Sequence, residues 1–225
     1  MPCPTALVTG SGSGLGKAIA DRLTKNGWMV YRWDKQGGHD VRDPNGMRMP
    51  AHLDILINCA GVNRISWLKD LDDETWDLVM DTNAKGIYKM TQACLEGLKA
   101  AKGTVVNIVS NAAHMPMRCS AAYNASKGAA LILTKQLARE LIGDGITVFS
   151  VSPNKLKGTG MSDDIDNQVV ETRGWTMEEA QRYQLAGLLT GKETDPHACA
   201  EFICWLLQEK YRHEALAGCD IPYGL

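Results

Sequence analysis

Short apolar runs alternate with longer amphipathic stretches along most of the 225-residue chain. Continuous apolar or β-branched runs indicate buried strands, and apolar residues at helical spacing indicate helices. The runs predicted as strands are residues 5–9, 28–33, 53–61, 103–110, 146–153 and 217–221. Helices are predicted over residues 15–26, from residue 73, and over 84–101, 119–142 and 196–210. This alternation favours βαβ units and therefore an α/β fold with one parallel sheet.

Two segments interrupt the alternation. Residues 34–53 leave no room for a full helix, so we predict a crossover trimmed to a loop, with a stub of strand at residues 39–41. Residues 154–175 are polar and contain glycine, which predicts a long loop. Long loops in compact domains are usually functional. We therefore predict a single doubly wound domain over residues 1–225, with a substrate-binding loop or lid at residues 154–190.

Composition and charge exclude several classes of protein. A formal net charge of -2 gives no electrostatic basis for binding nucleic acid or an anionic membrane. We find no apolar run long enough to span a bilayer, and the N-terminus enters a strand-like run directly, so we expect no signal peptide. The seven cysteines are scattered without a C-x-x-C pair. We expect reduced thiols in a cytoplasmic protein, with neither a disulfide framework nor a metal site.

A glycine-rich turn joins the first strand to the first helix. Its spacing is T-G-x-x-x-G-x-G from Thr9 to Gly16, and the G-x-G-x-x-G spacing fits in no frame. Glycine lets a backbone turn sharply and approach a ligand, and the helix N-terminus that follows suits a pyrophosphate. A tight loop without a ligand is the alternative interpretation of this motif alone.

Asp34 ends the second predicted strand, eighteen residues after Gly16. A carboxylate at this spacing can accept hydrogen bonds from the adenosine ribose hydroxyls, and it repels a 2′-phosphate. NAD is therefore favoured over NADP, although Arg32, Lys17 and Lys35 lie close enough in sequence to soften the preference. An ordinary surface aspartate is the alternative.

Tyr123 and Lys127 are spaced by one helical turn, so they share a face of the predicted helix. An ammonium close to a phenol stabilises the phenolate, and we expect Lys127 to lower the pKa of Tyr123 toward the working range of an acid–base catalyst. Ser110 ends the preceding strand, and ligands of parallel sheets bind at the carboxyl ends of strands. The alternative is a tyrosine and a lysine without special function on a half-exposed face.

With these motifs together, the chain resembles the short-chain dehydrogenase/reductase family over essentially its whole length. The turn at residues 9–16 resembles the family's cofactor turn, and N-C-A-G at residues 58–61 is similar to its N-N-A-G turn, with Cys59 in place of the second asparagine. Asn83 in D-T-N-A-K-G, the serine of N-I-V-S and the Y-N-A-S-K segment match the family's asparagine, serine, tyrosine and lysine. The resemblance implies a Rossmann fold and an NAD(P)-dependent oxidoreductase acting on an alcohol or ketone.

The same resemblance implies a role for each matched residue. Tyr123 would exchange a proton with the substrate oxygen, Ser110 would hydrogen-bond that oxygen, and Lys127 would bind the nicotinamide ribose. Asn83 would hold a water that connects Lys127 to solvent. The residues assigned to the cofactor are Gly10, Ser13, Gly14, Leu15, Gly16, Asp34, Asp40, Val41, Asn58, Ala60, Gly61, Tyr123, Lys127, Pro153, Asn154 and Thr159.

The chain departs from the family pattern after the sixth strand of that pattern. Pro153-Asn154 replaces the usual Pro-Gly, and Thr159 lies one position later than the family's threonine. These departures bear on the cofactor site rather than on Tyr123.

The substrate is harder to predict. Residues expected near it are His114, Met115, Arg118, Trp67 and Met161, with Asn63, Arg64, Trp175 and Arg173 as further candidates. An arginine among them could hold a carboxylate or phosphate, or could be a solvated surface residue. Two rival functions stay open: an NAD-assisted epimerase or dehydratase that uses the same tyrosine, and a catalytically silent NAD(H)-sensing protein. By analogy with the family, helices near 84–101 and 121–142 would form a homodimer or homotetramer interface.

Overall fold

A six-stranded parallel sheet forms the centre of the molecule, in the order β2-β1-β3-β4-β5-β6. The computed structural model describes residues 3–208 and 215–224. The strands are β1 Thr5–Thr9, β2 Met29–Trp33, β3 Ile55–Asn58, β4 Thr104–Ile108, β5 Thr147–Pro153 and β6 Asp220–Tyr223. Each pair of neighbouring strands is parallel. The predicted single α/β domain is therefore confirmed, and the last strand lies a few residues later than the predicted run.

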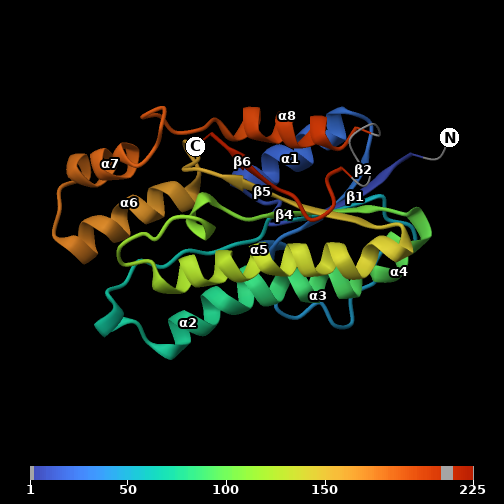
Figure 1. Cartoon of the computed structure of the whole chain (residues 1–225), viewed down its shortest axis with the longest axis horizontal. Coiled ribbons are helices and arrows are strands. Elements are labelled where there is room, and N and C mark those ends of the chain that lie inside the picture. Colours follow the sequence, from blue (N-terminus) through green and yellow to red (C-terminus); the bar gives the residue numbers. More distant parts are fainter. Residues whose placement is uncertain (1–2, 209–214, 225) are drawn as a thin grey trace.

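Helices cover both faces of the sheet (Figure 1). α1 (Gly14–Lys25) and α8 (Pro196–Leu206) lie on one face. The opposite face carries α2 (Asp73–Met80), α3 (Gly86–Ala93), α4 (Leu95–Ala101) and α5 (Ala121–Leu141). α6 (Gly160–Arg173) and α7 (Met177–Ala186) project together at one end of the molecule. This is the doubly wound arrangement that the sequence predicts, and the part of α8 predicted at residues 209–210 lies outside the described residues.

The strands divide their side chains between two hydrophobic clusters. Because side chains alternate along a strand, Ala6 and Val8 of β1 pack with α1 and α8, whereas Leu7 packs with Met90 and Leu98 on the other face. All of these side chains are almost completely buried. Burial on both faces explains why the central strands read as largely apolar runs in the sequence.

The crossover between β2 and β3 contains only one short 3-10 helix, Lys35–Gly37, which confirms the trimmed connection. β2 is consequently an edge strand of the sheet. The stub of strand predicted at residues 39–41 is wrong, because the chain turns there. The Asp40 carboxylate accepts a hydrogen bond from the Arg42 backbone N–H, and His39 stacks on Trp33 at 4.9 Å, so local contacts replace strand pairing.

The loop predicted at residues 154–175 is also wrong, because most of it forms α6. Thr159 caps the helix by accepting from the Ser162 backbone N–H, and Gly174 ends it with a φ of 68°. Of the three buried residues of α6, Ser162 and Asp166 are polar. A helix whose buried face is mostly polar carries almost no hydrophobic periodicity, which explains the missed element.

The helix predicted over residues 84–101 is divided. α2 continues through a π-helical segment, Asp81–Lys85, into α3, and the chain then breaks at Cys94 before α4. All seven cysteines fall in the described part of the chain, and none forms a disulfide. No helix there is long and apolar enough to cross a bilayer.

Candidate active site

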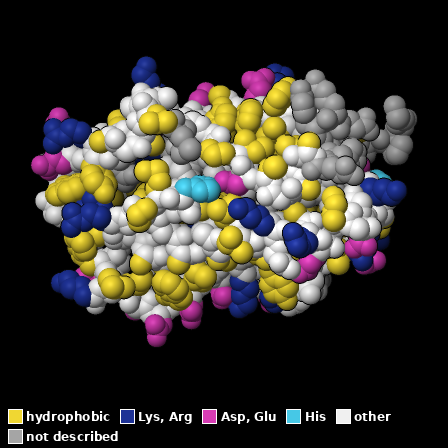
Figure 2. All heavy atoms as spheres, in the orientation of Figure 1, with side chains coloured by type: hydrophobic (Ala, Val, Ile, Leu, Met, Phe, Trp, Pro, Cys, Tyr) yellow, Lys and Arg dark blue, Asp and Glu magenta, His cyan; other side chains and the backbone are white. Residues whose placement is uncertain are grey.

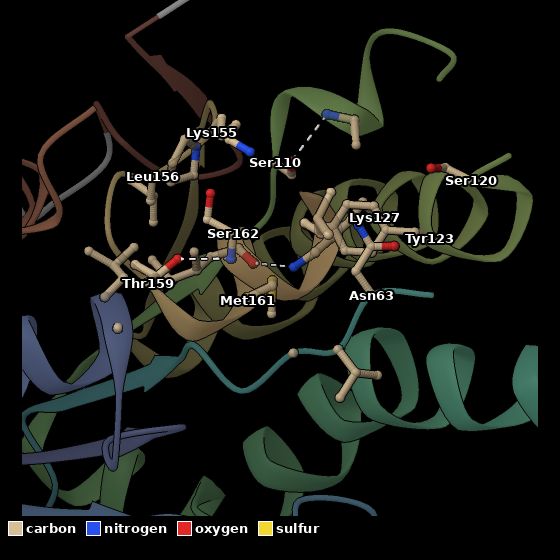
Figure 3. Close-up of a pocket in the computed structure, with 18 of the residues that line it drawn as sticks. Asn63, Ser110, Ser120, Tyr123, Lys127, Lys155, Leu156, Thr159, Met161 and Ser162 are labelled. Carbon is tan, nitrogen blue, oxygen red and sulfur yellow. Dashed lines mark hydrogen bonds between the residues drawn. The ribbon is translucent and has the colours of Figure 1, made fainter. Parts of the chain in front are cut away.

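A cavity of about 650 Å³ lies where β1, β4 and β5 end at their carboxyl termini. The glycine turn and the segment after β2 line one part of it. α5, α6 and α7 line the other part, with Tyr123 and Lys127 entering from α5 and Thr159, Met161 and Ser162 from α6 (Figure 3). Fifteen of the sixteen residues assigned to the cofactor line this cavity, Asn58 being the exception.

Two glycines of the glycine turn have no space for a side chain. Gly10 has a φ of +66°, and a Cβ there would lie 2.9 Å from the Ala60 backbone. A Cβ on Gly16 would lie 2.2 Å from the carbonyl oxygen of Gly10. Close backbone packing therefore requires glycine at both positions, and it shapes the wall of the cavity at the start of α1.

Asp34 is fixed beside this turn. Its carboxylate accepts from the Gly12 backbone N–H at 3.1 Å and from the Gln36 backbone N–H at 3.0 Å. Lys17 and Arg32, which could have opposed its charge, both pair instead with Asp21. Among the described residues, the carboxylate of Asp34 thus lines the cavity without a lysine or arginine within 4.0 Å.

A second carboxylate on this side is already engaged. Arg42 hydrogen-bonds both oxygens of Asp40, and this contact lowers the pKa of Asp40. Lys35 and Arg42 line the cavity on the same side.

Tyr123, Lys127 and Ser110 meet at the centre of the cavity. Tyr123 and Lys127 project from the first turns of α5, and their side chains are almost fully buried. The amine of Lys127 donates to the carbonyl oxygen of Ile108 at 2.9 Å and lies 5.7 Å from the centre of the Tyr123 ring. Ser110 follows β4, and its hydroxyl accepts from the Ala112 backbone N–H.

Burial, rather than the neighbouring amine, dominates the ionisation of this pair. Loss of solvent raises the pKa of Tyr123, while a hydrogen bond with Ser110 acts in the opposite direction. Loss of solvent also lowers the pKa of Lys127 to about 8. The prediction that Lys127 lowers the pKa of Tyr123 is therefore wrong for this structure, since no lowering by the lysine offsets the burial of the phenol.

Asn83 lies in the π-helical segment and is buried. Its amide donates to the Val62 carbonyl and to the Ser126 hydroxyl, and its oxygen accepts from the Val62 backbone N–H. The side chain thus fastens the segment after β3 to α5, directly beside Lys127.

Two residues of the N-C-A-G turn behave differently. Asn58 turns away from the cavity and donates to Asn107 in the buried layer between strands and helices. Cys59 lines the cavity, and burial raises the pKa of its thiol to about 12. Cys59 is therefore a neutral wall residue at ordinary pH.

Among the residues predicted for the substrate, Met115, Arg118, Met161, Asn63 and Arg173 line the cavity. His114, Trp67, Arg64 and Trp175 do not. The His114 ring binds the Asp220 carboxylate at 2.8 Å, and the Trp67 indole donates to the Thr172 carbonyl at 3.0 Å. Both side chains are thus occupied in contacts that hold loops in place.

Several residues of the wall lie within the predicted substrate-binding segment, residues 154–190, but were not named individually from the sequence. Lys155 and Leu156 follow β5, Ile165 and Val169 come from α6, and Tyr183 comes from α7. Lys155 forms a buried ion pair with Asp166, with Glu193 3.7 Å away. Lys155 comes two residues after the end of a buried strand. A charged side chain at such a position is usually paired, so the sequence could have indicated an ion pair at the cavity wall.

The departure at Asn154 has a structural explanation. Its amide binds the Gly224 carbonyl, and its oxygen accepts from the Thr194 hydroxyl at 2.6 Å. Asn154 therefore joins the end of β5 to two distant segments. In the described part of the chain, no group of histidine, cysteine or acidic side chains is arranged to hold a metal ion.

Comparison with known proteins gives consistent relatives. The family model described as short chain dehydrogenase matches residues 46–169. The 3-oxoacyl-acyl-carrier-protein reductase of Vibrio cholerae is 29% identical, over 89% of this chain and 88% of its own length. The 2-(S)-hydroxypropyl-CoM dehydrogenase 3 of Xanthobacter autotrophicus is 30% identical, over 97% and 94%.

A solved structure also resembles this chain in fold. A crystal structure of an actinorhodin polyketide ketoreductase with NADPH superposes with a TM-score of 0.83 at 26% identity, over 98% of this chain and 95% of that one.

Proposed function

The chain belongs to the short-chain dehydrogenase family, and we propose that it transfers a hydride between NAD(H) and a ketone or secondary alcohol, with Tyr123 as general acid and base. The coarser class, an oxidoreductase with a Rossmann fold and a nicotinamide cofactor, follows from its relatives. The observation that supports the finer proposal is the meeting of Ser110, Tyr123 and Lys127 in one cavity with the glycine turn.

The residues present fit a nicotinamide dinucleotide. The turn at residues 10–16 has no Cβ at the positions of closest approach, and Asp34 stands beside it with a carboxylate for ribose hydroxyls. Val41 and Asp40 would contact the adenine, and Lys127 the second ribose. Pro153, Asn154 and Thr159 would border the carboxamide. When bound, the nicotinamide would supply or accept the hydride.

The side chains of the pocket would then supply the proton that the ketone oxygen takes up. Because burial raises the pKa of Tyr123, its hydroxyl is protonated at neutral pH and can donate to the oxygen of a ketone. The Ser110 hydroxyl would orient the same oxygen. Lys127, with a pKa of about 8, still carries positive charge near pH 7, and its amine would donate to the nicotinamide ribose.

We propose that the proton returns to Tyr123 by way of Lys127 and a water held near Asn83. A Cβ placed on Gly61 would lie 3.3 Å from the Asn83 side-chain oxygen and 3.8 Å from the Lys127 amine. Both polar groups therefore face the same small space. Glycine at position 61 keeps that space open.

The proposal favours NAD over NADP because Asp34 keeps an available carboxylate at the ribose position. A 2′-phosphate there would meet a negative charge at short range. Lys35 and Arg42 line the same part of the cavity and would weaken this discrimination.

The experiment is a panel of ketones and secondary alcohols, followed by the absorbance of NADH, with NADPH in parallel. We expect turnover of at least one ketone with NADH, in line with relatives named for oxoacyl and hydroxyacyl substrates. Conversion of a substrate without net change in NADH would favour the epimerase or dehydratase. Tight NADH binding with no turnover on the whole panel would favour the silent sensor.

Residues 154–190 are proposed to cover the substrate. α6 is joined to the segment after β3, because Ile65 donates its backbone N–H to Gln168 and Trp67 donates to Thr172. This cover therefore consists of helices rather than a free loop. Hydrogen exchange with and without NADH and substrate would test it, with slower exchange expected across α6 and α7.

A homodimer or homotetramer is proposed through α3, α4 and α5, and we add the neighbouring α2 to this surface. Trp76, Tyr88 and Ile132 expose large apolar surfaces on these helices. Exposed apolar side chains on adjacent elements favour association. Light scattering should give a mass of two or four chains, and Ile132→Glu should lower it.

A further inference from the structure

Two arginines line the substrate part of the cavity without an acidic partner. In the described part of the chain, neither Arg118 nor Arg173 has a carboxylate oxygen within 4.0 Å, whereas Arg22, Arg32 and Arg42 each have one. Resting on the function proposed above, we propose that the substrate carries a carboxylate or phosphate group, which Arg118 contacts directly and Arg173 attracts and helps to position.

Arg173 is held by stacking. Its guanidinium carbon lies 4.7 Å from the centre of the Trp175 ring and 4.3 Å from that of Tyr183, and the two rings meet edge to face. Nε and Nη1 are buried and have no hydrogen-bond acceptor among the described residues. Nη2 donates to the Arg118 carbonyl oxygen at 3.0 Å. A charge fixed in this way, without a counter-ion, creates a positive potential at the cavity wall.

Arg118 is the accessible member of the pair. Its guanidinium lies over the Trp67 ring at 5.4 Å, and Trp67 is in turn fixed to α6 through Thr172. The side chain is otherwise exposed, and Arg173 holds its backbone through the carbonyl oxygen. A guanidinium that is oriented by a ring and open on its other side suits a planar carboxylate or a phosphate.

Among the residues that the structure describes, the acidic residues of the cavity wall lie on the proposed cofactor side, together with Lys35 and Arg42, and none comes from the elements that carry the two arginines. The acidic residues that line the cavity are Asp34 and Asp40, both of which follow β2. Around the arginines the wall is apolar, with Met115, Ile165 and Leu188. On the outer surface at the end of the molecule formed by α6 and α7, hydrophobic side chains lie beside both basic and acidic ones (Figure 2). The pocket therefore suits an apolar body that ends in an anion.

The first experiment compares matched substrates. Straight-chain 3-oxoacids from 3-oxobutanoate to 3-oxooctanoate are assayed with NADH beside their methyl esters, which keep the ketone and remove the charge. We expect a lower KM for at least one acid than for its ester. Arg118→Gln should raise the KM for that acid about tenfold or more, as expected for losing a charge-assisted hydrogen bond, and should leave the ester nearly unchanged.

Three further variants sharpen the comparison. Arg173→Gln should raise the KM for the acid as well, and Arg173→Lys, which keeps the charge, should recover part of the loss. Arg64→Gln is the matched control, because its guanidinium binds the Asn63 carbonyl and does not line the cavity. Thermal melting and NADH titration establish that each variant folds. Equal KM values for acid and ester in the wild type, or unchanged selectivity in both glutamine variants, would overturn the proposal.

A binding experiment separates this proposal from the proposed reaction. Hexanoate, hexyl phosphate and hexanamide are titrated calorimetrically into the wild type and Arg118→Gln in the presence of NADH. We expect the wild type to bind one or both anions more tightly than the amide, and Arg118→Gln to lose that preference. The stronger ligand identifies the preferred anion. Absence of turnover with every ketone would reject the reaction alone, whereas equal binding of all three ligands would reject the anion site.

Discussion

The amine of Lys127 lies 5.7 Å from the centre of the Tyr123 ring, and the protein encloses both side chains almost completely. Enclosure moves the two pKa values in opposite directions, up for the phenol and down to about 8 for the amine. A free tyrosine and a free lysine titrate at nearly the same pH. In this pocket the lysine therefore loses its proton at a lower pH than the phenol, and burial of the phenol keeps its hydroxyl protonated.

Replacing Tyr123 by phenylalanine removes the hydroxyl and keeps the ring. We expect kcat to fall roughly 10²–10⁴-fold, the usual contribution of a positioned acid or base. NADH binding, measured by fluorescence titration, should persist. Tyr88→Phe changes an exposed tyrosine of α3 in the same way and should keep full turnover. Wild-type kcat in Tyr123→Phe would contradict the assignment.

Replacing Lys127 by methionine should alter the pH dependence of stability. The depressed pKa of Lys127 means that, between about pH 8 and 10.5, the unfolded chain binds a proton that the folded chain has released. The wild type therefore gains free energy of unfolding with rising pH through this window, and the full shift corresponds to about 3 kcal/mol. The methionine variant lacks this gain.

The measurement is urea unfolding of both proteins at several pH values. Relative to Lys127→Met, the wild type should gain about 2 kcal/mol by pH 9.5. The buried cysteines have raised pKa values, so their titration lowers the free energy of unfolding as the pH rises through the same range. This contribution is present in both proteins and cancels in the comparison. The lost hydrogen bond to Ile108 adds only a constant offset. A difference that does not change with pH would show that Lys127 is not strongly desolvated.

Replacing Asp34 by serine tests the cofactor preference. Without the carboxylate, the ribose hydroxyls lose a charged acceptor, and a 2′-phosphate no longer meets a negative charge. We expect the ratio of kcat/KM for NADH to that for NADPH to fall by roughly tenfold or more. Asp43→Ser removes the same charge from a nearby exposed position outside the cavity and should leave the ratio unchanged. A ratio that stays constant in Asp34→Ser would remove Asp34 from the ribose site.

Replacing Gly16 by alanine tests the packing of the turn. The new methyl group would meet the Gly10 carbonyl oxygen at 2.2 Å, and backbone atoms cannot move aside easily. We expect a loss of about 1–3 kcal/mol in the free energy of unfolding and weaker NADH binding. Gly143→Ala, with nothing within 4 Å of its Cβ, should be neutral or slightly stabilising. Equal stability of the two variants in urea would show that the turn is not tightly packed.

The sequence predicts the central strands of this fold well because they are buried on both faces. β1, β4 and β5 read as apolar and β-branched runs interrupted only by Asn107, Ser150 and Ser152, and each follows the predicted range closely. α6 was missed for the opposite reason, since Ser162 and Asp166 occupy its buried face. Hydrophobic periodicity reports burial only where buried side chains are apolar.

In the site, residues placed by local spacing could be predicted from the sequence, whereas properties set by tertiary packing could not. Ser110, Tyr123 and Lys127 were predictable because their positions depend on a strand end and on one helical turn. The pKa of Tyr123 was not, because it depends on how far the surrounding chain excludes solvent. The roles of Lys155 and Arg173 depend on partners distant in sequence, Glu193 and Tyr183 among them.

The π-helical turn at Asp81–Lys85 makes this helix sensitive to length. A π turn holds one residue more than an α-helical turn, and that extra residue sets the direction in which Asn83 points. Deleting a single amino acid here would replace the wide turn by a regular α-helical turn and change the position of the residues within it. Asn83 would then swing away from Val62 and Ser126. A one-residue deletion would thus break the hydrogen bonds that join the segment after β3 to α5, although Ser110, Tyr123 and Lys127 would all still be present.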